Sequence, residues 1–166
     1  DLEAQGMTGL VIDLRDNPGG NLDTVCDILD LILPEGTIVS TKDKNGEGET
    51  YTSDEEHKLE IPLSVLTNGN SASASEIFAG AVQDYGVGTL VGTTTFGKGI
   101  VQQIFPLTDG TSIKLTISEY FTPKGRNIHG TGIDPDVEVE YEYNEEDPAA
   151  DNQLEKAIEI VKGNGM

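Results

Sequence analysis

Three loops of this 166-residue chain carry side chains that could do chemistry, and each directly follows a short apolar run. The runs, at residues 9–14, 62–67 and 89–92, have the length and composition of buried strands. Loops that follow the strands of an α/β protein are where functional groups tend to gather. We therefore examine these three loops as the candidate site.

The first loop, residues 70–76, reads Asn-Ser-Ala-Ser-Ala-Ser-Glu and opens a predicted helix. A serine there lies among free backbone N–H groups, at the positive end of the helix dipole. Such donors stabilise the oxyanion that forms when a serine attacks a carbonyl group, which makes Ser73 a candidate nucleophile. Ser73 and Glu76 also match the capping box Ser-x-x-Glu, so this motif alone favours a serine that only caps the helix.

The second loop places Lys98 between Gly97 and Gly99. Flanking glycines let the backbone pack closely and bring the amine inside, where burial lowers the pKa of a lysine by disfavouring its charged form. A neutral amine can take the proton of a serine hydroxyl. Gln102 lies four residues further on in a predicted strand, where it could share a face with Lys98 and orient the amine. Taken alone, the loop favours a solvated lysine.

The third loop, residues 17–20, reads Asn-Pro-Gly-Gly. A glycine at this point would let a backbone N–H approach the carbonyl group of a substrate. Taken alone, the same residues are typical of an ordinary turn between a strand and a helix.

Two other motifs imitate ligand-binding loops. Residues 92–98 match most of a phosphate-binding P-loop, but Gly99 stands where a Mg²⁺-binding Ser or Thr is needed, and a strand pattern follows instead of a helix. Residues 43–54 imitate a calcium loop, but Asn45-Gly46 is better explained as a hairpin turn and no helix pattern flanks it. We expect neither a nucleotide site nor an EF-hand.

Histidine and cysteine offer few alternatives. A Ser–His–Asp triad would need His57 or His129, and we interpret both as surface or structural residues. Cys26 is the only cysteine, so no internal disulfide can form, and its context is typical of a buried helix side chain. Two histidines and one cysteine cannot make a usual structural zinc site, so we expect no metal and no cofactor.

The composition is strongly acidic, with 30 Asp and Glu against 10 Lys and Arg and a formal net charge of −20. Nucleic-acid-binding proteins usually show a basic stripe, and this sequence has none. An anionic membrane surface would also repel the domain. We therefore expect no nucleic-acid partner and no direct membrane contact by this domain, and we interpret the charge as keeping it soluble.

The ends of the chain suggest an excerpt or a processed product, because it opens on Asp1 rather than Met. No apolar run is as long as a membrane-spanning helix requires, and no charged-then-apolar leader precedes the first strand. We expect that any targeting segment has been lost.

The spacing of apolar residues predicts helices at about residues 22–32, 73–85 and 151–162. In the last of these we expect Leu154, Ile158 and Val161 to face inward. An acidic, flexible stretch at 144–151 precedes it and could be a linker.

Alternating patterns predict two β-hairpins, one over residues 37–52 and one over residues 100–120. They turn at Asn45-Gly46 and at Asp109-Gly110. The order of strands and helices argues for an α/β fold with crossover connections.

Four segments together resemble the C-terminal processing peptidases, also called tail-specific proteases. These segments are residues 12–20, 71–79, 95–102 and 127–136, and the resemblance extends from Leu10 to Val139. Each motif alone is weak, but four in the right order are highly specific.

The resemblance implies a serine endopeptidase that trims or degrades proteins from exposed C-terminal tails. Ser73 would be its nucleophile, Lys98 its general base and Gln102 the third member of the site. The oxyanion donors would be the backbone N–H groups of Gly19 and Ala74. Its partners would be protein or peptide substrates, and the oligomeric state stays open.

The fold that the resemblance implies is a crotonase- or ClpP-like α/β core of stacked β–α turns, with an added β-hairpin. The family normally carries a PDZ domain that binds substrate C-termini by strand addition, further protease strands and a membrane or secretion signal. We therefore expect residues 1–166 to be a partial catalytic domain of an extracytoplasmic protein, from the cell envelope or secreted.

Asp84 matches a position discussed in the family, but it lies eleven residues after Ser73, roughly 16 Å along a helix, so we predict a structural role.

A non-catalytic binding or scaffold module on the same fold stays open, because fold does not fix function. An acyl-CoA enzyme of the crotonase type is suggested by fold analogy alone, and its chemistry would not need Ser73 and Lys98.

Overall fold

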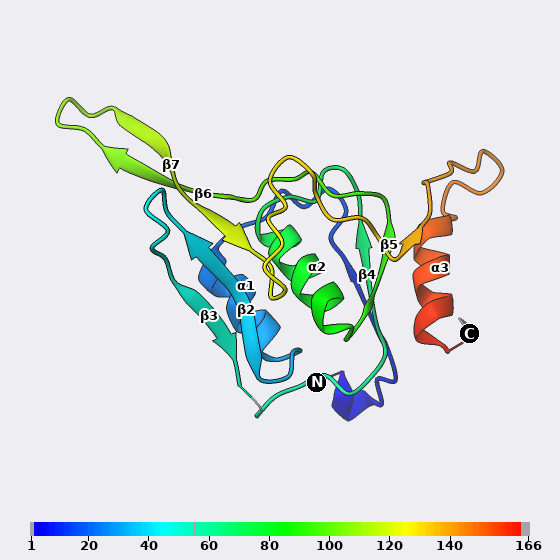
Figure 1. Ribbon diagram of the computed structural model, residues 1–166. Helices are drawn as coiled ribbons and strands as arrows, with labels where there is room; N and C mark the ends of the chain where they lie inside the picture. The colour runs from blue at the N-terminus through cyan, green and yellow to red at the C-terminus, as the bar shows by residue number, and fades with distance from the viewer. Residues whose placement is uncertain (1, 55, 164–166) are drawn as a thin grey trace.

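The computed structural model describes residues 2–54 and 56–163, which form two sheets and three α-helices (Figure 1). In chain order the elements are η1 (Glu3–Gln5), β1 (Leu10–Asp13), α1 (Leu22–Asp30), β2 (Gly36–Lys42), β3 (Thr50–Ser53), β4 (Leu63–Thr67), α2 (Ala74–Tyr85), β5 (Thr89–Gly92), β6 (Ile100–Pro106), β7 (Ser112–Phe121), β8 (Val137–Glu138) and α3 (Asn152–Val161). The α/β class and both β-hairpins predicted from the sequence are confirmed.

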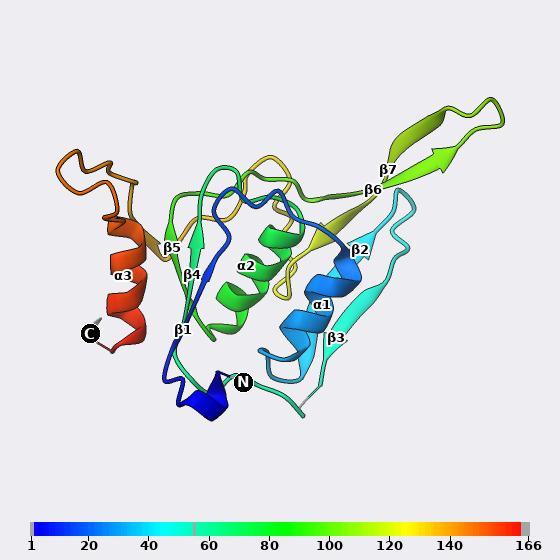
Figure 2. The same cartoon turned by 180° about the vertical axis from the view of Figure 1, so that it is seen from behind.

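One sheet is parallel, with the strand order β1-β4-β5-β8. Helix α2 packs on one of its faces and α3 on the other, as the view from behind shows (Figure 2). All five residues of β4 are buried, as expected for a central strand that is covered on both faces. Because the strands are parallel, the loops that follow β1, β4 and β5 emerge at the same edge of the sheet.

The other sheet is antiparallel, with the strand order β3-β2-β7-β6. Its centre is the pairing of β2 with β7, which joins the two hairpins. The distal part of the β6–β7 hairpin extends away from the body of the molecule (Figure 1). Most of its side chains are exposed, so this hairpin adds surface rather than core.

Helix α2 lies at the centre of the fold, between the parallel sheet on one side and α1 and β2 on the other. The sequence pattern predicted one apolar face, whereas ten of the twelve helix residues are buried. Small residues make this possible, because Ala79, Gly80 and Ala81 let neighbouring elements approach closely. A Cβ on Gly80, for example, would lie 2.8 Å from the Thr122 side chain.

Helix α3 packs on the sheet through a face that was predicted only in part: Ile158 and Val161 are half-buried, and a Cβ on Gly9 would lie 3.2 Å from the Cβ of Val161. Leu154 was expected to face inward but is 36% exposed, and the buried residues are Gln153 and Ala157. Hydrogen bonds of Gln153 explain why this residue is buried. Its amide donates to the carbonyl oxygen of Val139 at 2.6 Å, and its side-chain oxygen accepts from Arg15 at 2.9 Å. These bonds turn the neighbouring leucine outward.

Strand β8 was not predicted, because it has only two residues and directly follows a Gly- and Pro-rich segment. Val137 and Glu138 pair in parallel with Val91 and Gly92 and complete the sheet. Among the helices of the described residues, none has the length and apolar character that crossing a membrane requires.

Candidate active site

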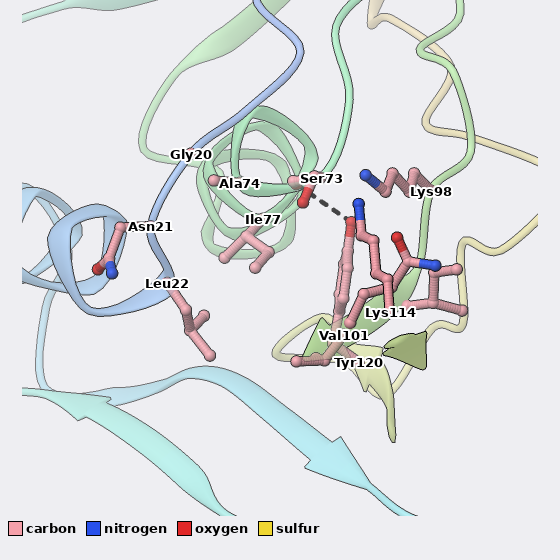
Figure 3. Close-up of a pocket in the computed structure, with 12 residues that line it drawn as sticks. Gly20, Asn21, Leu22, Ser73, Ala74, Ile77, Lys98, Val101, Lys114 and Tyr120 are labelled. Atoms are coloured by element: carbon pink, nitrogen blue, oxygen red, sulfur yellow. Dashed lines mark hydrogen bonds between the residues drawn. The ribbon is translucent and has the colours of Figure 1, made fainter. Parts of the chain in front are cut away.

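A pocket of about 330 Å³ brings together residues of all three candidate loops, which contribute Gly20, Ser73 and Lys98. Ser73, Lys98 and Gln102 all line it, between the N-termini of α1 and α2 and the base of the β6–β7 hairpin (Figure 3). The complete lining is Gly20, Asn21, Leu22, Ser73, Ala74, Ile77, Lys98, Ile100, Val101, Gln102, Lys114 and Tyr120.

Ser73 has a backbone conformation that a non-glycine residue rarely adopts, with φ +57° and ψ −118°. Such conformations cost on the order of 1–3 kcal/mol and persist only where the surroundings enforce them. A sharp, strained turn between a strand and a helix is also how a nucleophilic serine is presented in other hydrolases. The strain therefore coincides with the residue that the sequence selected for chemistry.

The two neighbouring serines are structural. Ser71 is buried and its hydroxyl donates to the carbonyl oxygen of Leu14 at 2.7 Å, while the Ser75 hydroxyl donates to that of Asn17 at 3.0 Å. Both bonds fasten the start of α2 to the loop after β1. The Ser73 hydroxyl donates no such bond within the described residues, so it is the serine of this motif whose proton is not engaged.

The capping-box motif is present, but Ser73 is not an ordinary cap. Its backbone N–H donates to the Glu76 carboxylate at 2.9 Å. No cap hydrogen bond of ordinary geometry reaches the Ser73 side chain, and its backbone lacks the extended conformation usual for a capping serine. The hydroxyl is available to the pocket.

Glu76 is the residue that fixes the serine loop relative to the lysine loop. Its side chain is fully buried and accepts four hydrogen bonds. One comes from Ser73 N–H and three come from the other loop: the Thr95 hydroxyl at 2.6 Å, Gly97 N–H at 2.7 Å and Lys98 N–H at 2.8 Å. A single carboxylate thus positions the candidate nucleophile and the candidate base.

Lys98 is half-buried, and its amine points into the pocket (Figure 3). Within the described residues its amine makes no hydrogen bond or ion pair, including none to Ser73. The flanking glycines do what the sequence suggested: a Cβ on Gly97 would lie 3.0 Å from Gly132 N, and one on Gly99 would lie 2.7 Å from His129 N. Close packing of residues 129–132 therefore requires glycine on both sides of the lysine.

Gln102 lines the pocket but makes no hydrogen bond to Lys98. Its amide donates to the hydroxyl of Thr116 at 3.4 Å, across the hairpin. The expectation that the two residues share a strand face does not hold, because β6 begins only at Ile100 and the pairing shifts register between Val101 and Gln102. The orienting bond predicted from spacing is not formed.

Gly19 packs directly against the serine turn. Its φ is +95°, and a Cβ there would lie 2.5 Å from Ala72 O and 2.7 Å from Ala74 N, so only glycine fits. Its N–H donates to the Asn17 side chain at 2.9 Å. Ala74 N–H, in the first turn of α2, has no partner within the described residues, so one of the two predicted oxyanion donors is free and the other is engaged.

The remaining candidates lie outside this pocket. Burial raises the pKa of the Cys26 thiol to about 11, helped by nearby Asp23 and Asp27, which makes it a poor nucleophile. Asp84 accepts a hydrogen bond from Lys124 N–H and pairs with Arg126, contacts of the structural kind predicted for it. His57 and His129 are exposed, and neither lines the pocket.

One known protein family matches most of the chain. The model described as peptidase family S41 matches residues 1–139. The chain belongs to peptidase family S41.

Curated relatives carry names that agree with this family. The chain is 46% identical over 165 residues to a carboxyl-terminal-processing protease of Synechocystis sp., covering 98% of this chain and 39% of that protein. It is 44% identical over 140 residues to the carboxy-terminal processing protease CtpB of Bacillus subtilis, covering 84% of this chain and 29% of the relative. The S41 chain therefore spans well under half of the relatives' length.

Solved structures show the same core. A photosystem II D1 C-terminal processing protease aligns with a TM-score of 0.78 at 37% identity, over 84% of this chain and 36% of that one. A putative S41 protease from Bacteroides fragilis aligns over all of this chain and 48% of that one, with a TM-score of 0.79 at 20% identity, which shows the fold alone.

Sequence reasoning missed two residues of this S41 site. Tyr120 is buried and its hydroxyl donates to the carbonyl oxygen of Ser73 at 3.1 Å, drawn as the dashed line in Figure 3. Burial, together with the charge of Glu76, raises the pKa of the Tyr120 phenol, so it stays a neutral donor. Lys114 also lines the pocket, and the available signal was its place in the predicted hairpin, on the strand that pairs with the one carrying Gln102.

An apolar hollow of about 450 Å³ adjoins the other side of the serine turn of this S41 chain. Gly19, Gly20 and Ala74 form its rim towards Ser73. Its apolar walls come from β1 and the residue that follows it, from α1 and from α2: Ile12, Leu14, Val25, Ile28 and Phe78.

Proposed function

We propose that this chain is part of the catalytic domain of a serine-type C-terminal processing peptidase, with Ser73 as nucleophile and Lys98 as general base. The observation that carries the proposal is one geometric fact. Within the part of the chain that the structure describes, the Ser73 hydroxyl on its strained turn donates no hydrogen bond and the Lys98 amine is unpaired; the two share a pocket, and the buried Glu76 carboxylate holds both of their loops.

The chemistry follows from these positions. Lys98, in its neutral form, takes the proton of the Ser73 hydroxyl as its oxygen attacks the carbonyl carbon of a peptide bond. Ala74 N–H donates to the resulting oxyanion, and Gly19 N–H would join it after leaving Asn17. The Lys98 ammonium then protonates the departing amine, and water hydrolyses the acyl-enzyme with the lysine again as base.

Substrate chemistry completes the proposal. The relatives named above are C-terminal processing proteases, so we infer protein or peptide substrates cut near exposed C-termini, in an extracytoplasmic setting. The apolar hollow beside Ser73 would receive an apolar side chain next to the scissile bond. Gln102 would assist Lys98 only after its side chain has exchanged the hydrogen bond to Thr116 for one to Lys98.

A binding module without turnover is the second candidate. Two observations favour it: Gly19 N–H is engaged by Asn17, and the Gln102 amide is engaged by Thr116. Peptide binding without hydrolysis by the full-length protein would support this alternative.

The test is hydrolysis of a quenched-fluorescent peptide by the full-length protein and its variants. Ser73→Ala and Lys98→Ala should each lower kcat/KM by at least about 10³-fold while the fold is kept. Ser112→Ala and Lys124→Ala, which change exposed side chains outside the pocket, should leave kcat/KM within twofold. Full activity in Ser73→Ala would reject the nucleophile.

A further inference from the structure

The pocket around Ser73 is locally basic in an acidic molecule. Lys98 and Lys114 both line it, and none of its lining residues is Asp or Glu. In the whole chain, by contrast, 30 acidic residues face 10 basic ones. A pocket with two amines and no carboxylate favours an anionic group in whatever enters it, because complementary charge is what such a site selects.

Lys114 reaches this pocket from strand β7. It stands opposite Ile104 in the hairpin register, two residues before Thr116, which stands opposite Gln102. Side chains two apart in a strand share a face, so Lys114 lies on the same hairpin face as Thr116 and Gln102. Figure 3 shows its side chain extending into the pocket that Ser73 and Lys98 also line.

The Lys114 ammonium is free to bind a ligand. Within the described residues it makes no hydrogen bond or ion pair, whereas Lys58 and Lys156 are each paired with a glutamate. Lys98 must be neutral to act as a base, so Lys114 is the amine of the pocket that remains to neutralise an anion.

We propose that Lys114 binds the free C-terminal carboxylate of the peptide segment that is being removed. The inference rests on the proposed peptidase function, and it deepens that function by naming the substrate group that is recognised beside the scissile bond. Because the proposed substrates are cut near exposed C-termini, the segment beyond the cut is short, and its terminal carboxylate can lie within this pocket of about 330 Å³. An Asp or Glu side chain near the bond is the other source of the same chemistry.

Peptide binding tests this without requiring turnover. In the Ser73→Ala chain, we would measure by fluorescence anisotropy the Kd of N-terminally labelled tetra-alanine as the free acid and as the C-terminal amide. A third probe, the amide with its last alanine replaced by glutamate, carries a carboxylate only on a side chain. The same three Kd values would be measured after adding Lys114→Met or, as a matched control, Lys162→Met, which removes a charge at the exposed end of α3.

The free acid should bind about threefold to tenfold more tightly than the amide, the range for a partly exposed ion pair that is also hydrogen-bonded. Lys114→Met should abolish this difference, Lys162→Met should keep it, and the glutamate amide should bind like the plain amide. Tighter binding of the glutamate amide would overturn the assignment to the C-terminus in favour of a side chain.

Equal Kd values for acid and amide, absence of binding by all three probes, or a difference that survives Lys114→Met would overturn the carboxylate site altogether. Hydrolysis by the protein that retains Ser73 is measured separately. Lys114-dependent binding without hydrolysis would reject the proposed peptidase function and leave the carboxylate site standing.

Discussion

Glu76 is the residue on which the geometry of the site depends most. Replacing it with glutamine keeps its size but turns one acceptor into an NH₂ group that faces N–H and O–H donors. An unsatisfied buried donor costs about 1–3 kcal/mol, so we expect Glu76→Gln to lower the free energy of unfolding by about 3 kcal/mol, measured by urea denaturation. Activity of the folded fraction should fall at least tenfold, because both loops lose their common anchor.

The control for this change is Glu145→Gln, which removes the same charge from an exposed loop. It should alter the free energy of unfolding by less than about 0.5 kcal/mol. If Glu76→Gln behaved like this control in both stability and activity, the carboxylate would not be the anchor that its hydrogen bonds indicate.

Gly19 and Gly20 offer a matched pair of substitutions. Alanine at Gly19 would need a positive φ and would place its Cβ 2.5 Å from Ala72 O, whereas a Cβ at Gly20 meets nothing within 4 Å. We expect Gly19→Ala to cost about 1–3 kcal/mol in thermal unfolding and to displace the Ser73 turn, with Gly20→Ala nearly neutral. Equal effects of the two would argue against the close contact at Gly19.

Residue roles were predictable where a local pattern expresses them. The Ser-x-x-Glu spacing pointed to both Ser73 and Glu76, and the Gly-Lys-Gly sequence pointed to close packing around Lys98. The pattern could not reveal that Glu76 also binds residues 95, 97 and 98, because those partners lie about twenty positions away in the chain. Nor could counting along a strand anticipate the register shift that directs Gln102 to Thr116.

At the scale of the elements, Arg15 joins the end of β1 to the start of α3. Its guanidinium donates to Asp151, the N-cap of α3, at 2.7 and 3.1 Å, and this bond holds the pKa of Asp151 below its usual range. A carboxyl group whose pKa is lower in the folded state than in the unfolded state stabilises the fold. This stabilisation is complete at pH values above the unfolded pKa of about 4, and it is lost as the pH falls through the lower folded pKa.

Asp151→Asn tests this docking contact, because asparagine can still cap the helix but cannot form the ion pair. We expect it to lower the free energy of unfolding by about 1 kcal/mol at pH 7, and by much less near pH 2.5. Asp27→Asn, an exposed change on α1, is the control and should show no such pH dependence. A loss from Asp151→Asn that is the same at both pH values would contradict the role of the ion pair.

The elements themselves followed from the sequence more completely than their packing did. Apolar spacing placed all three helices, and Asn45-Gly46 and Asp109-Gly110 located both hairpin turns, because turn chemistry is local. The buried face of α3 was predicted only in part because a polar residue, Gln153, anchors it. Strand β8 was missed because two residues supported by a neighbouring strand leave no periodic pattern.

At the scale of the whole molecule, the excess of 20 negative charges is the dominant electrostatic feature. Self-repulsion in so acidic a chain destabilises the compact state, and salt screens it. We expect the Tm at pH 7 to rise by a few degrees between about 10 and 300 mM NaCl. An unchanged or falling Tm in differential scanning calorimetry would show that favourable ion pairs outweigh the repulsion.

The account as a whole depends on Ser73 being a nucleophile activated by Lys98, and mapping a covalent adduct tests this most directly. After reaction of the protein with a fluorophosphonate, tryptic peptides would be analysed by mass spectrometry. We expect the adduct on Ser73, with a rate at least about 10²-fold lower in Lys98→Ala and unchanged in Lys124→Ala. An adduct on another residue, or equal labelling of Ser73 without the Lys98 amine, would contradict the assignment.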